Sequence, residues 1–237
     1  MPKYLSRFWR QGVFRFTIIG SALFIVLTVI AMFFYPGGSL TDPTTKGYSF
    51  FSNFFSELGF LVTKSGAVNT PSAVLFIAAL TMAGLGLVFF FLAFPQFYQQ
   101  TKVARILSLF GAIFGILSGI CFIGVAWAPA DVLLDLHVFF VMWAFRLFPV
   151  AAFFYAFAIF RHPDYPKRYG WVFVIFGILL VAYILLLELG PNASDSYTGQ
   201  VIQVVGQKVI VYTSIGSILI QAGGALRRNV NKALPRI

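Results

Sequence analysis

Six apolar stretches, each long enough to cross a bilayer as a helix, constrain the fold of this chain more than any other feature. A transmembrane helix needs about 20 consecutive apolar residues. The 237-residue chain is 59% hydrophobic and only 10% charged, whereas a soluble domain typically carries about 25% charged residues. The sequence therefore predicts an all-α polytopic membrane protein in which residues 1–237 form a single domain with six transmembrane helices. The predicted spans cover residues of about 15–35, 73–97, 104–128, 137–160, 171–190 and 207–226.

The basic residues indicate how the six spans are oriented. Thirteen of the 17 Lys and Arg residues lie in the two terminal segments and in the connections between spans two and three and spans four and five. They are Lys3, Arg7, Arg10, Arg15, Lys102, Arg105, Arg161, Lys167, Arg168, Arg227, Arg228, Lys232 and Arg236. Because loops rich in Lys and Arg face the cytoplasm, we expect a cell-membrane protein with cytoplasmic N- and C-termini and a long outer loop at 36–72. The net charge of +10 then reports topology, so membrane lipids rather than nucleic acids are the expected partners.

One segment of the outer loop, "SFFSNFFSELGF" (49–60), combines phenylalanines with polar residues. On a helix its aromatic residues and Leu58 fall on one face, the polar residues up to Glu57 fall on the other, and Gly59 suits the C-terminal position. The predicted short amphipathic helix carries no Lys or Arg, although helices that lie on a membrane surface usually do. We interpret its polar face as turned inward, onto the spanning helices. The alternative is a helix at the headgroup level with Glu57 in water.

Arg146 lies about nine residues into the fourth predicted span, which is about 13 Å at 1.5 Å per residue. A charge at that depth costs at least about 2.5 kcal/mol and is usually paired or lines a cavity. Glu57 and Glu188 are the candidate partners, because both lie near the outer membrane boundary. The structural alternative is a set of ion pairs that pin helices together, with Lys208 reaching for the headgroups. We predict that one outward-facing polar cavity collects Glu57, Asp135, His137, Arg146, Glu188, Gln207 and Lys208.

No catalytic residue, cofactor or metal is predicted from a motif. The sequence has no Gly-x-Ser-x-Gly, His-Glu-x-x-His or phosphate-binding glycine loop. Asp131 and Asp135 are one helical turn apart and His137 is close by, so a cation site is one reading and ordinary hydrogen bonding is the other. Glycines at 111, 115 and 119 have the spacing of four that allows close helix packing.

Three features resemble a known family. The first is "FFSELG" (54–59), the second is "GVAWAPADVLLDLHVFFVMWAF" (124–145), and the third is the six-span layout with a long first outer loop. They resemble the prokaryotic membrane family known as domain of unknown function 998, which is distantly similar to Frag1/DRAM/Sfk1 membrane proteins, some of which act on or respond to lipids. The resemblance implies no established reaction, and it adds Ser56 and Asp131 to the predicted cavity. The family-like positions are Ser56, Glu57, Gly59, Pro129, Asp131 and His137.

Three functions are compatible with these features. The first is binding or sensing of a lipid or small amphiphile in the outward-facing cavity, with Glu57 and Arg146 as the central polar pair. The second is an accessory subunit of a larger membrane complex. The third is an enzyme acting on lipid headgroups, with His137 or Glu57 as general base and Asp131 and Asp135 binding a cation.

Overall fold

The computed structural model describes residues 7–233, and in this part of the chain the regular structure is helical. Six helices are long and apolar enough to cross a membrane, as predicted. The basic residues Lys3 and Arg236 and the side chain of Lys232 lie outside the described part, so their predicted placement stays a prediction. The elements are η1 (Phe8–Gly12), α2 (Val13–Phe34), η2 (Phe55–Gly59), α3 (Thr70–Ala93), η3 (Phe94–Phe97), α4 (Lys102–Trp127), α5 (Leu134–Arg161), α6 (Lys167–Leu189) and α7 (Tyr197–Ala233).

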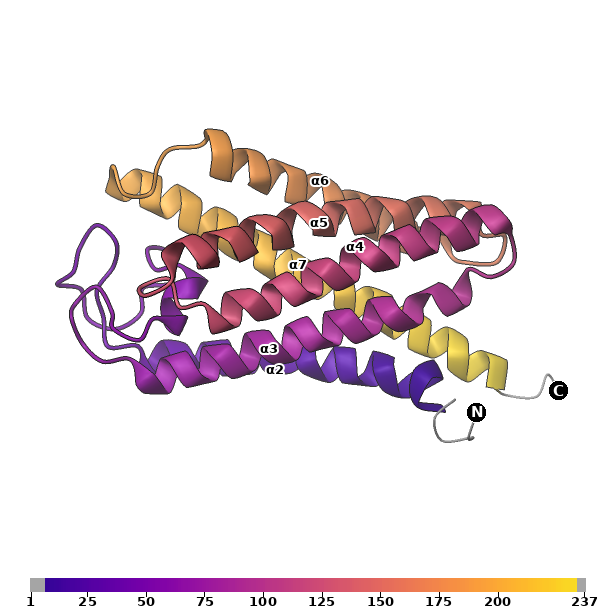
Figure 1. Cartoon of the computed structure of the whole chain (residues 1–237), viewed down its shortest axis with the longest axis horizontal. Helices are drawn as coiled ribbons and strands as arrows, with labels where there is room; N and C mark the ends of the chain where they lie inside the picture. Colours follow the sequence, from indigo (N-terminus) through magenta and orange to yellow (C-terminus); the bar gives the residue numbers. More distant parts are fainter. Residues whose placement is uncertain (1–6, 234–237) are drawn as a thin grey trace.

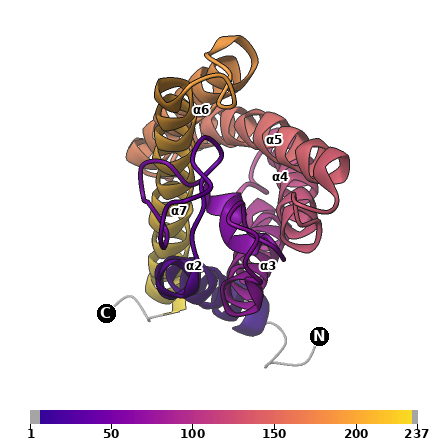
Figure 2. The same cartoon turned by 90° about the vertical axis from the view of Figure 1, so that its left-hand side faces the viewer.

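The six long helices form a closed bundle. Each helix packs against the next one along the chain, and α7 completes the ring by contacting both α2 and α6 (Figure 1). Seen along the bundle, the 35–69 loop covers one end, with η2 near the centre of the ring (Figure 2). We call this the loop end. At the opposite, terminal end, the Asn229 side chain donates to the carbonyl of Arg10, which joins the last helix to the first turns of the chain.

Five predicted spans match the helices to within a few residues, whereas α7 begins about ten residues earlier than predicted, at Tyr197. The segment before residue 207 contains Gln200 and Gln203, which the sequence analysis placed outside the span. In the structure both side chains are buried and hydrogen-bonded to protein groups. A polar side chain that is satisfied internally does not need to leave the helix for water, and this explains the longer helix.

The predicted amphipathic helix at 49–59 is wrong in its extent. Only Phe55–Gly59 is helical, as a 3₁₀ turn, and residue Phe54 before it is extended with ψ 154°. The Asn53 side chain accepts a hydrogen bond from the Ser49 backbone N–H at 2.9 Å. Such local side-chain bonds compete with helix formation. The predicted inward orientation is nevertheless confirmed for three polar residues that are buried: Ser52, Asn53 and Glu57.

Two buried apolar clusters fill the bundle. The larger one is rich in aromatic rings, includes Phe94 and Tyr155, and extends to the terminal end. The smaller one lies at the loop end, where Phe55 and Leu58 of η2 pack against Phe76 of α3. The outside of the bundle is apolar as well, as the exposed Ile113 and Leu117 of α4 illustrate. An apolar exterior is expected for helices surrounded by lipid.

The glycine spacing in α4 marks close helix packing, as predicted. A Cβ atom on Gly115 would lie 2.2 Å from the ring of Phe91 in α3, and one on Gly119 would lie 3.1 Å from the carbonyl oxygen of Gly84. Small residues at such positions let helix backbones approach.

We expect Gly115→Ala to destabilise the protein by about 1–3 kcal/mol, because the added methyl group overpacks the contact with Phe91. The measurement is the thermal unfolding midpoint in mild detergent. The matched control is Gly216→Ala in α7, where an added Cβ meets nothing within 4 Å, and where alanine favours the helix. Equal midpoints for the two variants would contradict the packing role of Gly115.

Candidate functional site

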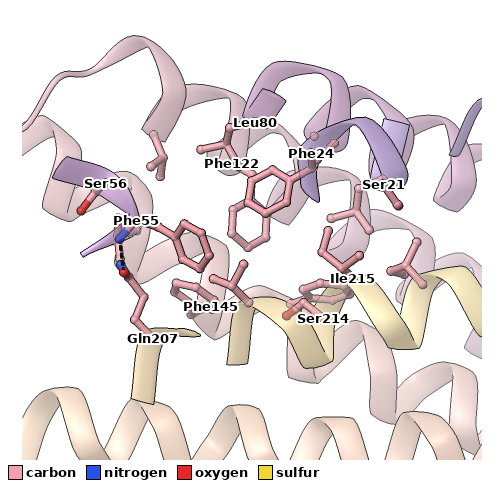
Figure 3. Close-up of a pocket in the computed structure, with 18 of the residues that line it drawn as sticks. Ser21, Phe24, Phe55, Ser56, Leu80, Phe122, Phe145, Gln207, Ser214 and Ile215 are labelled. Carbon is pink, nitrogen blue, oxygen red and sulfur yellow. Dashed lines mark hydrogen bonds between the residues drawn. The ribbon is translucent and has the colours of Figure 1, made fainter. Parts of the chain in front are cut away.

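A cavity of about 90 Å³ lies inside the ring of helices, beneath η2 (Figure 3). Phenylalanine rings from α2, η2, α3, α4 and α5 line it together with aliphatic side chains, and α7 supplies the remaining side. The predicted cavity was polar, whereas the observed one is mainly apolar and includes only Ser56 and Gln207 of the nine predicted residues. The polar residues of its lining are Ser21, Ser56, Gln207 and Ser214.

Three of the polar groups around the cavity have unused hydrogen-bonding capacity. Gln207 accepts a hydrogen bond from the Phe55 backbone N–H at 2.7 Å through its Oε1 atom (Figure 3). Within the described part of the chain, its Nε2 atom and the hydroxyls of Ser21 and Ser56 make no hydrogen bond. Ser214, in contrast, donates to the Ile210 carbonyl one turn earlier, at 2.7 Å. A ligand in the cavity would thus meet apolar walls with a few polar groups available to orient it.

The loop above the cavity is fastened to α7. The Gln200 side chain donates to the Ser52 carbonyl and accepts from both the backbone and the hydroxyl of Thr41. Gln207 and Lys208 bind the loop two turns further along the same helix. The polar stripe seen in the sequence of α7 therefore holds the loop in place as a cover over the cavity.

Lys208 makes the central contact between α7 and the loop. Its side chain is buried, and the ammonium group donates to the Asn53 carbonyl at 2.5 Å. Three rings surround the ammonium group: Phe50 and Phe55 with centroids at 5.0 Å and Tyr48 at 5.2 Å. A cation over aromatic faces at this distance gains about 2 kcal/mol or more when it is desolvated. Lys208 is therefore held by the loop, and it does not reach for the headgroups as the alternative reading expected.

Glu57 lies in the same polar cluster and is only 2% exposed. Its carboxylate accepts hydrogen bonds from the Asn53 side-chain amide and, at 3.4 Å, from the Tyr35 hydroxyl. Burial raises the pKa of Glu57, and the Asn53 bond and the charge of Lys208 offset this only in part. Glu57 and Lys208 do not form a direct ion pair, because the one pair within 4.0 Å in residues 7–229 is that of Arg146 and Glu188.

The raised pKa of Glu57 predicts how stability depends on pH. A folded-state pKa above the unfolded value near 4.5 means that the folded state holds this proton more tightly. The resulting stabilisation is complete below about pH 4.5 and is lost as the pH rises through the folded-state pKa. We expect the unfolding midpoint of the wild type, relative to Glu57→Gln, to increase as the pH falls from 8 towards 4.5. The groups facing this carboxyl are Tyr35, Tyr48, Asn53 and Lys208. A difference in midpoint between the two proteins that does not change with pH would contradict the raised pKa of Glu57.

Arg146 and Glu188 form a second, separate site. The guanidinium Nη2 atom lies 2.6 Å from the carboxylate of Glu188, and the side chains are 45% and 42% exposed. The pair joins α5 to α6 on the outside of the bundle. Glu188 was one of the two predicted partners of Arg146, and Glu57, the other, binds Asn53 and Tyr35 instead. The predicted convergence of Arg146 with Glu57 on one cavity is therefore wrong.

The remaining predicted residues have structural contacts of their own. The Asp131 carboxylate accepts hydrogen bonds from the backbone N–H groups of Leu61 and Val62, both at 2.9 Å. His137 is buried, and its Nδ1 atom donates to the Ala128 carbonyl at 2.7 Å. Asp135 is exposed. Among the residues that the structure describes, no three His, Cys, Asp or Glu side chains come together as metal ligands.

Sequence reasoning missed several residues of the polar cluster. Asn53 connects Glu57 to Lys208 through its side chain and its carbonyl, and Tyr35 and Tyr48 complete the cluster. The spacing of four between Asn53 and Glu57 was the available signal, since it placed both on one polar face. No pattern in the sequence marked the two tyrosines.

No family model matches the chain, and no curated protein or solved structure is found to be similar to it. The resemblance to domain of unknown function 998 therefore stays a prediction, carried by the short motifs around Glu57 and Asp131.

Proposed function

We propose that this integral membrane protein binds or senses a lipid or small amphiphile whose apolar segment enters the central cavity. The observation that carries the proposal is the cavity itself, an apolar space of about 90 Å³ inside the bundle. The loop that covers it is hydrogen-bonded to α7. Sites for whole drug-sized ligands are typically about 300–1,000 Å³. The cavity therefore suits a short alkyl or aryl segment, and the rest of the ligand would extend beyond it.

The polar end of the ligand is assigned to the loop end of the cavity. There the free Nε2 group of Gln207 and the Ser56 hydroxyl can bind a headgroup, while the phenylalanine rings contact the apolar part. The distribution of Lys and Arg supports an orientation with the terminal end in the cytoplasm and the loop end outside, in the cell membrane. The ligand would then enter from the outer leaflet or the outer medium.

Photocrosslinking tests this proposal directly. The full-length protein in native membranes is exposed to an alkyl alcohol that carries a diazirine on its chain, and incorporation is mapped by mass spectrometry. We expect labels on the cavity-lining segments of α3 and α7. Ser214→Leu, which fills the cavity from α7, should lower incorporation several-fold.

Thr213→Leu is the matched control. Thr213 precedes Ser214, does not line the cavity, and makes the same kind of hydrogen bond to the carbonyl four residues earlier, at 2.7 Å. Its labelling should equal that of the wild type. Equal labelling of all three proteins, or labels confined to the lipid-facing surface, would rule out the cavity as the binding site.

The exposed ion pair favours a second candidate, an accessory subunit of a membrane complex. Arg146 and Glu188 lie on the outside of the bundle, where a partner helix with polar groups would shield them from lipid. In native electrophoresis of membranes in mild detergent, the wild type should migrate in a larger complex and Arg146→Leu/Glu188→Leu as a monomer. Migration of the wild type as a monomer would contradict this candidate.

A further inference from the structure

A second group of buried polar side chains lies at the terminal end of the bundle, and none of them lines the cavity. Five of its atoms have no hydrogen-bond partner among the described residues: the hydroxyls of Tyr98, Tyr155 and Tyr165, Nε2 of His162 and Nε of Arg228. Nearly all buried polar atoms in proteins are satisfied, and groups of exceptions point to an unseen water or ion. The side chains of Tyr98, Tyr155, His162 and Tyr165 are all 2% exposed or less.

The five side chains form one compact cluster. The Tyr98 ring lies 5.6 Å from that of Tyr165, 5.8 Å from that of Tyr155 and 5.9 Å from the imidazole of His162. The Arg228 guanidinium stacks on Tyr165 at 5.0 Å. These residues come from the connection after η3, from α5, from the connection between α5 and α6, and from α7.

The cluster consists mainly of hydrogen-bond donors. Nδ1 of His162 accepts a hydrogen bond from the Asp164 backbone N–H at 3.0 Å, so the neutral ring carries its proton on Nε2. Burial and the charge of Arg228 lower the pKa of His162 and keep it neutral. The carbonyl of Phe97 lies near this ring without forming a hydrogen bond to Nε2. Nε of Arg228 is always a donor.

The numbers of hydrogen-bond donors and acceptors in the cluster indicate which kind of ligand it would bind. The five groups carry five polar hydrogens, whereas the three phenol oxygens are their only acceptors. Because a buried phenol oxygen that also donates usually accepts a single hydrogen bond, bonds within the cluster, such as one between Tyr98 and Tyr165, satisfy about three of the five donors. A water molecule adds two donors together with two acceptor sites, so it does not remove the excess. An anion adds acceptor sites alone, and it also balances the fixed charge of Arg228, whose one hydrogen bond in the described chain goes to the Asp164 carbonyl.

We propose that the cluster of Tyr98, Tyr155, His162, Tyr165 and Arg228 binds one small monovalent inorganic anion, of the size of chloride. The anion accepts hydrogen bonds from the unpartnered donors and holds the two connections at the terminal end against α7. This site is independent of the ligand proposed for the central cavity.

Halide dependence of stability tests the proposal on the full-length protein in detergent. Gluconate, which is too large for the cluster, is replaced stepwise by chloride or bromide at constant ionic strength. We expect a saturable rise of the unfolding midpoint by about 5 °C, the size expected for a ligand well above its dissociation constant. A structure in bromide should show an anomalous peak within hydrogen-bonding distance of the Tyr98 and Tyr165 hydroxyls.

Tyr98→Phe/Tyr165→Phe removes two donors and keeps both rings. This variant should lose the halide effect, and in gluconate it should be at least as stable as the wild type, because two unpaired buried hydroxyls are gone. Tyr183→Phe, a buried tyrosine outside the cluster, is the matched control and should keep the halide effect.

Two results would overturn the proposal. One is a wild-type midpoint that is the same in gluconate, chloride and bromide. The other is density at the cluster with no anomalous signal in bromide, which would identify ordered water. The second measurement uses the wild type, so it decides the matter even if the double variant does not fold.

Discussion

Lys208→Met is expected to destabilise the protein by about 3 kcal/mol, the cost typical of removing one charge from a buried polar network. The ammonium group bridges α7 to the loop through the Asn53 carbonyl and three aromatic rings. Methionine has a similar length, but it leaves that carbonyl with the Tyr48 hydroxyl, at 2.9 Å, in place of two donors, and it leaves Glu57 without a neighbouring positive charge. The thermal unfolding midpoint gives the global effect, and hydrogen exchange over 35–69 should show that the loop opens.

A second substitution shows how much of the stability lost in Lys208→Met is due to the lost charge and how much to the lost packing. Glu57→Gln added to Lys208→Met should recover part of the lost stability, because it removes the carboxylate that the single variant leaves uncompensated. Lys64→Met is the matched control, since Lys64 is exposed and lies over a single ring at 5.8 Å. If the single and double variants have the same midpoint, the charge of Lys208 does not act on Glu57.

The second large effect is expected for Glu188→Leu, which leaves Arg146 without its counter-charge. Arg146 lies 12 residues after the start of α5, which is about 18 Å along the helix. An unpaired charge within a membrane-spanning helix costs at least about 2.5 kcal/mol, so we expect a loss of that order. The pair is half exposed on the outside of the bundle, so the surroundings of the stranded guanidinium would be apolar.

Arg146→Leu/Glu188→Leu should restore the stability that Glu188→Leu loses. Two leucines suit a lipid-facing surface, and replacing a desolvated ion pair by apolar residues is often neutral or stabilising. The unfolding midpoints of the wild type, both single variants and the double variant form a complete cycle. An unchanged midpoint for Glu188→Leu would mean that Arg146 reaches water on its own.

The spans could be predicted from the sequence because a long apolar run leaves few alternatives to a membrane helix. The depth of Arg146 in the membrane stays a prediction, whereas its contact with Glu188, one of the two expected partners, is present in the structure. The choice between Glu188 and Glu57 did not follow, because depth along a helix does not fix which neighbouring helix a side chain faces. That choice depends on how the loop folds, and the loop is held by local bonds such as those of Asn53.

The cavity could not be predicted from residue types. Phe148 lines the space and Phe176 fills the core beside it, yet both are buried phenylalanines on membrane helices. Whether a ring closes a gap or borders one depends on the packing of several helices together. The polar residues gave a partial signal, since Gln207 and Ser56 border the cavity, while Asp131 and His137 bind nearby backbone groups instead.

The helix α7 runs without interruption for 37 residues, about 55 Å, well beyond the roughly 30 Å of a hydrocarbon core. Near its beginning, Gln200 and Lys208 bind the loop, and near its end the Arg228 guanidinium packs on the Tyr165 ring. Such a rod cannot slide or tilt at one membrane face without moving at the other. A displacement of this helix where it contacts the loop would therefore be transmitted to the contact between Asn229 and Arg10 at the terminal end.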